Sequence, residues 1–187
     1  MVDVLSQMKQ LGVHIHAERF QVRQPPTTIH MNDPSNSPAA DRLDVCETFT
    51  RMLHAIDARE WQEVRSAFAD EVTTDYTQLF GGDVQTQRSD GLIAGWRDFA
   101  AAFDATQHLT GPFVVGLADD TARAQCAVTA RHRMGEAQWI VGGHYDVRLV
   151  RRGSHGWAIT AITLRVAFIE GDTSLPERAR QRVTGNW

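Results

Sequence analysis

The sequence predicts an α+β domain in which helices come first and one curved antiparallel sheet follows. Two features of the chain lead to this prediction. Between residues 41 and 103, apolar side chains recur mostly at spacings of three and four, as on one face of a helix. From residue 108 onward they alternate with polar side chains, as along a strand with one buried face. Helices followed by a run of long strands are typical of an α+β fold.

Three helices and one strand are expected in the first half of the domain. Residues 41–58, 60–68 and 91–103 each place apolar side chains at helical spacing. Residues 71–80 are rich in Thr, Val and Tyr and predict a strand. Residues 81–91 contain three glycines and mostly polar side chains, so they predict a loop.

Two pairs of strands are expected in the second half. Residues 109–134 predict the first pair, with a turn at residues 118–120. Residues 137–168 predict the second pair, with a turn at residues 152–156. Together these segments form the predicted sheet.

The domain is expected to cover residues 41–172. Residues 1–40 predict an N-terminal extension, because its second half has the Pro, Ser, Asn and Thr content of a linker or an extended arm. Residues 173–187 predict a C-terminal tail, for which two alternatives stay open. The tail either covers the mouth of a pocket or is disordered.

Composition excludes several classes of protein. The chain has 187 residues, of which 42% are hydrophobic and 22% charged, as in a soluble globular protein. A net charge of −4 with scattered basic residues argues against a nucleic-acid partner. No apolar run reaches the roughly 18–20 residues of a membrane span, and the N-terminus lacks a secretory signal pattern, so a cytoplasmic location is expected. The two cysteines are not spaced for a zinc cluster or a redox pair.

Strand alternation indicates which side chains face the interior. In residues 121–133, one row consists of small apolar side chains and ends in His132, which should therefore point inward. In the next strand, one row carries His144 and Asp146 and the other carries Tyr145. Because both rows are partly apolar, we expect helices to cover one face of the sheet and a second subunit to cover the other.

Asp57 is placed unusually for an acid. It closes the first predicted helix, where a carboxylate opposes the helix dipole at a cost of about 0.3–1 kcal/mol when exposed. Two interpretations follow. Either Asp57 has a compensating partner, or it caps the helix that begins shortly after it.

Three separated segments resemble the SnoaL-like, scytalone dehydratase-like family of the nuclear transport factor two-like superfamily. They are "AIDAREWQEVRSAFADEVTTDY", "TQHLTGP" and "GGHYDVRLVRRGSHGWAITAITLRVAFIEG", and the resemblance covers about residues 41–171. It implies a cone-shaped α+β barrel, in which a strongly bent antiparallel sheet wraps around a long helix and leaves an apolar pocket.

The resemblance also implies a catalytic dyad of Asp57 and His108, assisted by Tyr76 and His132. A neutral imidazole is a competent base near neutral pH, and a carboxylate on its other nitrogen stabilises the imidazolium that forms. Tyr76 and His132 would donate hydrogen bonds to a carbonyl or leaving-group oxygen. The expected activity is that of a lyase or isomerase of the dehydratase type. Proton removal is followed by loss of water or halide, or by a double-bond shift, and no metal or cofactor is needed.

Four further residues are expected to contact a small hydrophobic, cyclic substrate. They are His144, Asp146, Trp96 and Phe80, and for His144 and Asp146 a structural or interface pair is the other interpretation. The sequence departs from the scytalone dehydratase pattern at His144 and Asp146, and at Ile56, where that enzyme has a tyrosine. These differences argue against scytalone itself as the substrate.

Two alternatives from other functional classes remain open at the level of sequence. A non-catalytic ligand-binding protein would keep the pocket and lose the proton chemistry. A scaffold subunit, like the small subunit of ring-hydroxylating dioxygenases, would have its pocket filled by side chains. A homo-oligomer is expected for this protein, either a dimer or a trimer.

Overall fold

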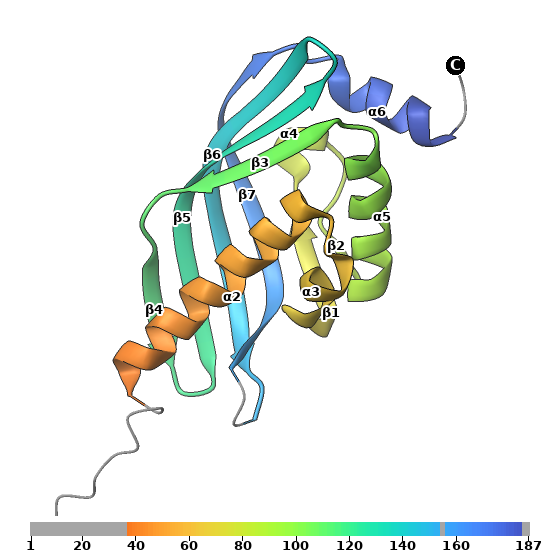
Figure 1. Ribbon diagram of the computed structural model, residues 1–187. Helices are drawn as coiled ribbons and strands as arrows, with labels where there is room; N and C mark the ends of the chain where they lie inside the picture. The colour runs from red at the N-terminus through yellow and green to blue at the C-terminus, as the bar shows by residue number, and fades with distance from the viewer. Residues whose placement is uncertain (1–36, 154–155, 185–187) are drawn as a thin grey trace, which may run out of the picture. The chain divides into compact units, whose positions relative to one another are not determined.

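The computed structural model describes residues 37–153 and 156–184, in which a seven-stranded sheet packs against helices (Figure 1). Most of the N-terminal extension predicted for residues 1–40 lies outside the described residues. In chain order, the elements are α2 (Pro38–Ala58), α3 (Trp61–Ser66), β1 (Phe68–Asp75), α4 (Thr77–Phe80), β2 (Gln85–Arg88), α5 (Ser89–Ala101), β3 (Ala105–Thr110), β4 (Val114–Ala118), β5 (Thr121–Met134), β6 (Ala137–Arg151), β7 (Trp157–Gly171) and α6 (Leu175–Thr184). No helix among these residues is both long and apolar enough to cross a membrane.

The sheet has the strand order β2-β1-β7-β6-β5-β3, and β4 pairs with the first half of β5. All pairs are antiparallel except β1 with β7, which is parallel. The predicted α+β class and the curved sheet are therefore confirmed, with one parallel pair that the sequence pattern did not indicate.

Glycines at the centre of β6 accompany an irregularity in the sheet. The register between β6 and β7 shifts between Gly142 and Gly143, and such a shift bends a strand. A side chain at Gly142 would overlap the ring of Phe168, and one at Gly143 would overlap the main-chain oxygen of Arg165. The exposed Phe168 ring can move aside, whereas the main chain of Arg165 cannot, so Gly143 is the position at which the close approach of the two strands requires glycine.

Helix α2 lies across the concave side of the sheet (Figure 1). Ser37 caps its start, accepting a hydrogen bond from the backbone N–H of Ala40 at 3.1 Å, and Pro38 occupies the first helical position. The helix thus begins three residues before the predicted residue 41. Its buried face includes Val45 and Phe49, both fully inaccessible to solvent.

Three local predictions need correction. Strand β1 ends at Asp75 instead of residue 80, because the Asp75 carboxylate accepts hydrogen bonds from the backbone and the hydroxyl of Thr77 and starts the short helix α4. The predicted loop contains the edge strand β2, which alternation could not indicate because all its residues are exposed. His108 does not precede a strand but lies inside β3, opposite Ala130 of β5.

The described part of the C-terminal tail forms α6 and packs on the domain. Leu175 and Ala179 are fully buried. Arg182 donates a hydrogen bond of 2.9 Å to the main-chain oxygen of Ala102, directly after α5. This arrangement places α6 beside α5 at one end of the domain (Figure 1).

Candidate active site

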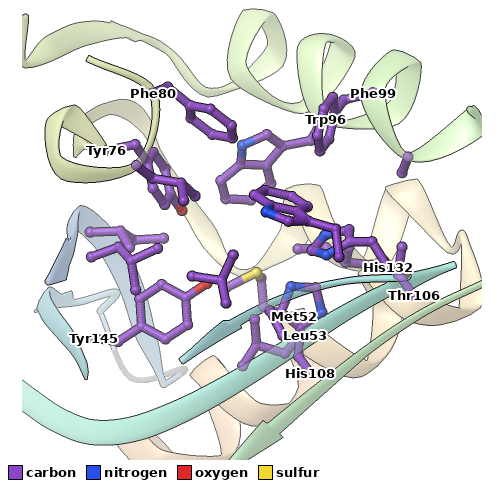
Figure 2. Close-up of a pocket in the computed structure, with 18 of the residues that line it drawn as sticks. Met52, Leu53, Tyr76, Phe80, Trp96, Phe99, Thr106, His108, His132 and Tyr145 are labelled. Carbon is purple, nitrogen blue, oxygen red and sulfur yellow. The ribbon is translucent and has the colours of Figure 1, made fainter. Parts of the chain in front are cut away.

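A cavity of about 260 Å³ lies between the helices and the concave side of the sheet. Figure 2 shows Phe80, Trp96 and Phe99 on one side of it, with Tyr145 and His108 on the other. Most of its lining is apolar or aromatic. The polar side chains that line it are Thr106, His108, His132, Tyr76, Tyr145 and Arg180.

Asp57 and His108 meet at the cavity wall. The last turn of α2 carries Asp57 and the middle of β3 carries His108, and Asp57 Oδ1 lies 2.8 Å from His108 Nδ1. Asp57 Oδ2 accepts the backbone N–H of His108 at 2.8 Å, and Oδ1 also accepts the hydroxyl of Thr106 at 2.9 Å. Asp57 therefore has a compensating partner. The alternative cap role is wrong, because Glu60 occupies the position before α3.

The two side chains of the dyad are largely buried, but each keeps a small solvent-exposed fraction. The side chains of His108 and Asp57 are 10% and 19% exposed. Burial raises the pKa of Asp57, but the hydrogen bonds from His108 and Thr106 outweigh it, so that the pKa lies below its ordinary value of 3.8. Asp57 is thus a carboxylate at neutral pH, and it can stabilise a protonated His108.

His132 lies beside the dyad, at the inner end of the β5 row. Its ring centroid is 6.0 Å from that of His108 and 4.7 Å from that of Trp139. Burial, together with the neighbouring His108, lowers its pKa from 6.5 to about 4, so the ring is neutral at neutral pH. His132 Nδ1 is buried without a hydrogen-bond partner among the described residues. The predicted inward direction of His132 is confirmed by the burial pattern of β5.

Tyr76 and Tyr145 form a second polar group at the cavity. Tyr76 directly precedes α4, Tyr145 comes from β6, and their hydroxyl groups interact with each other. Burial raises the pKa of both, so both remain protonated donors at neutral pH. Tyr145 was not among the predicted site residues. The sequence does contain a signal for Tyr145, because Val147 and Leu149 lie in the same row of the strand. The structure buries all three side chains.

The expectation that His144 and Asp146 contact the substrate is wrong. Successive side chains of a strand point to opposite faces, so both neighbours of the inward-facing Tyr145 point outward. His144 is exposed. On the outer face Asp146 forms an ion pair with Arg123 and accepts a hydrogen bond from Gln125 at 3.3 Å. Neither residue lines the cavity.

Trp96 and Phe80 both line the cavity, as the sequence indicated. Phe80 is 44% exposed. The guanidinium of Arg180 lies 5.2 Å from the centre of the Phe80 ring, which brings α6 to this part of the cavity. Arg180 was not predicted, because the helical pattern of α6 is weak. Among the described residues, no group of three or more His, Cys, Asp or Glu side chains is placed to hold a metal ion.

Comparison with known proteins identifies the family. Residues 37–163 match the SnoaL-like domain. A protein from Kribbella flavida is 27% identical with a TM-score of 0.71, over 75% of this chain and 99% of that one. A candidate aromatic ring hydroxylase from Novosphingobium aromaticivorans is 22% identical with a TM-score of 0.66, over 75% of this chain and 99% of its own. A candidate scytalone dehydratase from the same species is 16% identical with a TM-score of 0.63, over 72% of this chain and 89% of that one.

The comparison with curated proteins gave no match. The two Novosphingobium structures share the fold of this chain at identities too low to carry an activity across. The match to the family is of a different kind, because it extends from the start of α2 into β7 and covers more than half of the sequence. This protein therefore belongs to the SnoaL-like domain family.

Proposed function

We propose that this protein is a cofactor-independent lyase or isomerase of the dehydratase type, with His108 as the base. The observation that carries the proposal is the Asp57–His108 pair, joined at 2.8 Å in the wall of an apolar cavity. Asp57 occupies Nδ1 of the imidazole, which leaves Nε2 for proton transfer. A carboxylate in this position orients the ring and stabilises the imidazolium that forms.

The remaining polar side chains suit the stabilisation of an enolate. His132, Tyr76 and Tyr145 are neutral at neutral pH, and they provide polar groups for hydrogen bonds in a region with little water. In the proposed reaction, His108 removes the proton next to a carbonyl and the carbonyl oxygen gains the negative charge. Expulsion of a β-hydroxyl group then re-forms the carbonyl, and the proton on His108 leaves with the hydroxyl as water.

The cavity favours a small cyclic substrate. About 260 Å³ with aromatic side chains on several sides suits a molecule of one or two rings. Ile56 lines the cavity where the scytalone dehydratase pattern has a tyrosine, so the substrate should differ from scytalone at the group that a tyrosine would bind. The fold that this chain shares with a candidate scytalone dehydratase is compatible with this reaction class.

Two other functions compete with this proposal. A scaffold subunit should have its pocket filled by side chains, and the cavity argues against that role. A non-catalytic ligand-binding protein would also have a cavity. The dyad favours catalysis over binding alone, because an ionised carboxylate held on an imidazole beside a pocket supplies a base that binding does not require.

The test is a screen of cyclic β-hydroxy ketones with the full chain. Loss of water is followed by the absorbance of the conjugated enone, and exchange of the acidic proton in D₂O is followed by mass spectrometry. Asp57→Asn and His108→Gln should lower turnover by about 10²–10⁴-fold. The matched controls Asp146→Asn and His144→Gln change the same residue types on the outer face and should leave turnover unchanged.

Two results would contradict the proposal. Dyad variants that retain full turnover would show that another group is the base. Substrates that bind to the wild type without turnover or proton exchange would show that the protein is a binding protein.

A further inference from the structure

Arg59 adopts a backbone conformation that arginine seldom takes. It directly follows α2, and its φ of 65° lies in the left-handed region, where helix ends usually place glycine. A side chain is disfavoured there, so a function for that side chain is the natural hypothesis.

The Arg59 guanidinium connects three segments around the dyad. Its Nη1 donates to the hydroxyl of Thr106 at 3.2 Å and to the main-chain oxygen of Ile56 at 3.4 Å. Its Nη2 donates to the main-chain oxygen of Phe103 at 3.4 Å. The end of α2, the segment after α5 and strand β3 are thereby held together behind Asp57.

Thr106 connects Arg59 to the dyad through two hydrogen bonds. Its hydroxyl accepts from Arg59 and donates to Asp57 Oδ1 at 2.9 Å, the same oxygen that faces His108 Nδ1. A hydroxyl that accepts from a cation becomes a stronger donor, so each bond of the chain strengthens the next. The Asp57 carboxylate therefore has a fixed orientation, and so has the ring that it holds.

Charge supports the same arrangement. Asp57 lies at the negative end of the α2 dipole, and the last turn of that helix contains no basic residue. Arg59, one residue beyond the helix, supplies the missing positive charge, and it interacts electrostatically with Asp57.

We propose that Arg59 and Thr106 are positioning residues that keep Asp57 in one orientation and thereby hold neutral His108 in the tautomer with its proton on Nδ1. Nε2 is then unprotonated and free to act as the base. The proposal rests on the proposed function only in assigning the base to His108. The tautomer itself can be observed without any substrate, so a failure of either proposal can be recognised separately.

The experiment is ¹⁵N NMR of the imidazole nitrogens in the full chain, at about pH 8.5, two units above the ordinary histidine pKa. In the wild type, His108 should show a protonated Nδ1 and an unprotonated Nε2. In Arg59→Met and Thr106→Val, both nitrogen shifts should move toward the averaged values of two exchanging tautomers. Thr106→Ser keeps the hydroxyl and should restore the wild-type shifts.

A matched control separates positioning from stability. The Arg152 guanidinium also donates hydrogen bonds to main-chain oxygens, those of Ser66 and Phe68, at a site remote from the dyad. Arg152→Met should leave the His108 shifts unchanged even if the protein becomes less stable. Arg59→Gly removes the guanidinium while relieving the backbone, so it provides a folded variant if Arg59→Met does not fold. Wild-type His108 shifts in Arg59→Gly and Thr106→Val would overturn the proposal.

Discussion

Two alanines of β5 provide a direct test of the cavity. Ala124 and Ala130 belong to the same inward-facing row and both are buried. Ala130 lines the cavity, whereas Ala124 packs between the neighbouring strands, opposite Val115 and Val147. Replacement of each alanine by leucine adds the same three carbons, at one position into open space and at the other into filled space.

The two substitutions should change stability in opposite directions. Burial of three carbons contributes about 0.8 kcal/mol each, and ordering a leucine side chain costs about 0.5–1 kcal/mol. Ala130→Leu should therefore raise the free energy of unfolding by about 1.5 kcal/mol, which is about 3–6 °C in Tm for a domain of this size. Ala124→Leu has no cavity to fill, and overpacking should lower the free energy of unfolding by about 1–3 kcal/mol.

The assay is urea unfolding of the wild type and both variants, followed by far-UV circular dichroism. Ala130→Leu should also abolish turnover, because the added side chain occupies the space beside His108. If both variants are destabilised to the same extent, the cavity is not open at Ala130 and the reasoning about the pocket is refuted.

Three further predictions concern pH, thiol reactivity and an ion pair. The pKa of buried His132 falls from 6.5 to about 4, so the unfolded chain binds more protons between these values and the protein loses about 3 kcal/mol of stability as pH decreases across them. His132→Phe should flatten this dependence in urea unfolding measured from pH 7 to 4.5. Burial raises the pKa of Cys126 to about 11, so its thiol should react with Ellman's reagent only when the protein unfolds. Asp41→Asn breaks the paired hydrogen bonds of 2.8 and 2.9 Å from Arg151 and should cost about 1–2 kcal/mol in urea unfolding.

The sequence predicted those features that depend on a period within one element. The β5 row was assigned correctly because one of its faces is small and apolar while the other is polar, so His132 could be placed inside. Alternation was less informative on β6. Tyr145 shares its row with Val147 and Leu149, but the row of His144 and Asp146 also contains Ile140 and Val150, so the two faces differ less than those of β5.

Contacts between segments that are distant in the sequence could not be predicted from local patterns. Arg59 and Thr106 are 47 positions apart, and nothing in either segment alone indicates that they meet. Helix α6 was also difficult to predict. Its buried residues are Leu175 and Ala179, and most of its other described side chains are charged or polar, so the apolar stripe is too narrow to define a buried face.

Several locally unfavourable features occur together at this cavity. Asp57 lies at the wrong end of a helix dipole, Arg59 holds a left-handed backbone, and His132 buries a ring nitrogen without a partner. Each feature alone lowers stability. The first two are offset by a shared network, since the guanidinium that follows the strained backbone lies beside the carboxylate that needs a positive charge. The unpartnered nitrogen of His132 is not offset by any described residue. A bound molecule that offers it a hydrogen bond would remove that cost, so this wall of the cavity is suited to bind a polar group of a ligand.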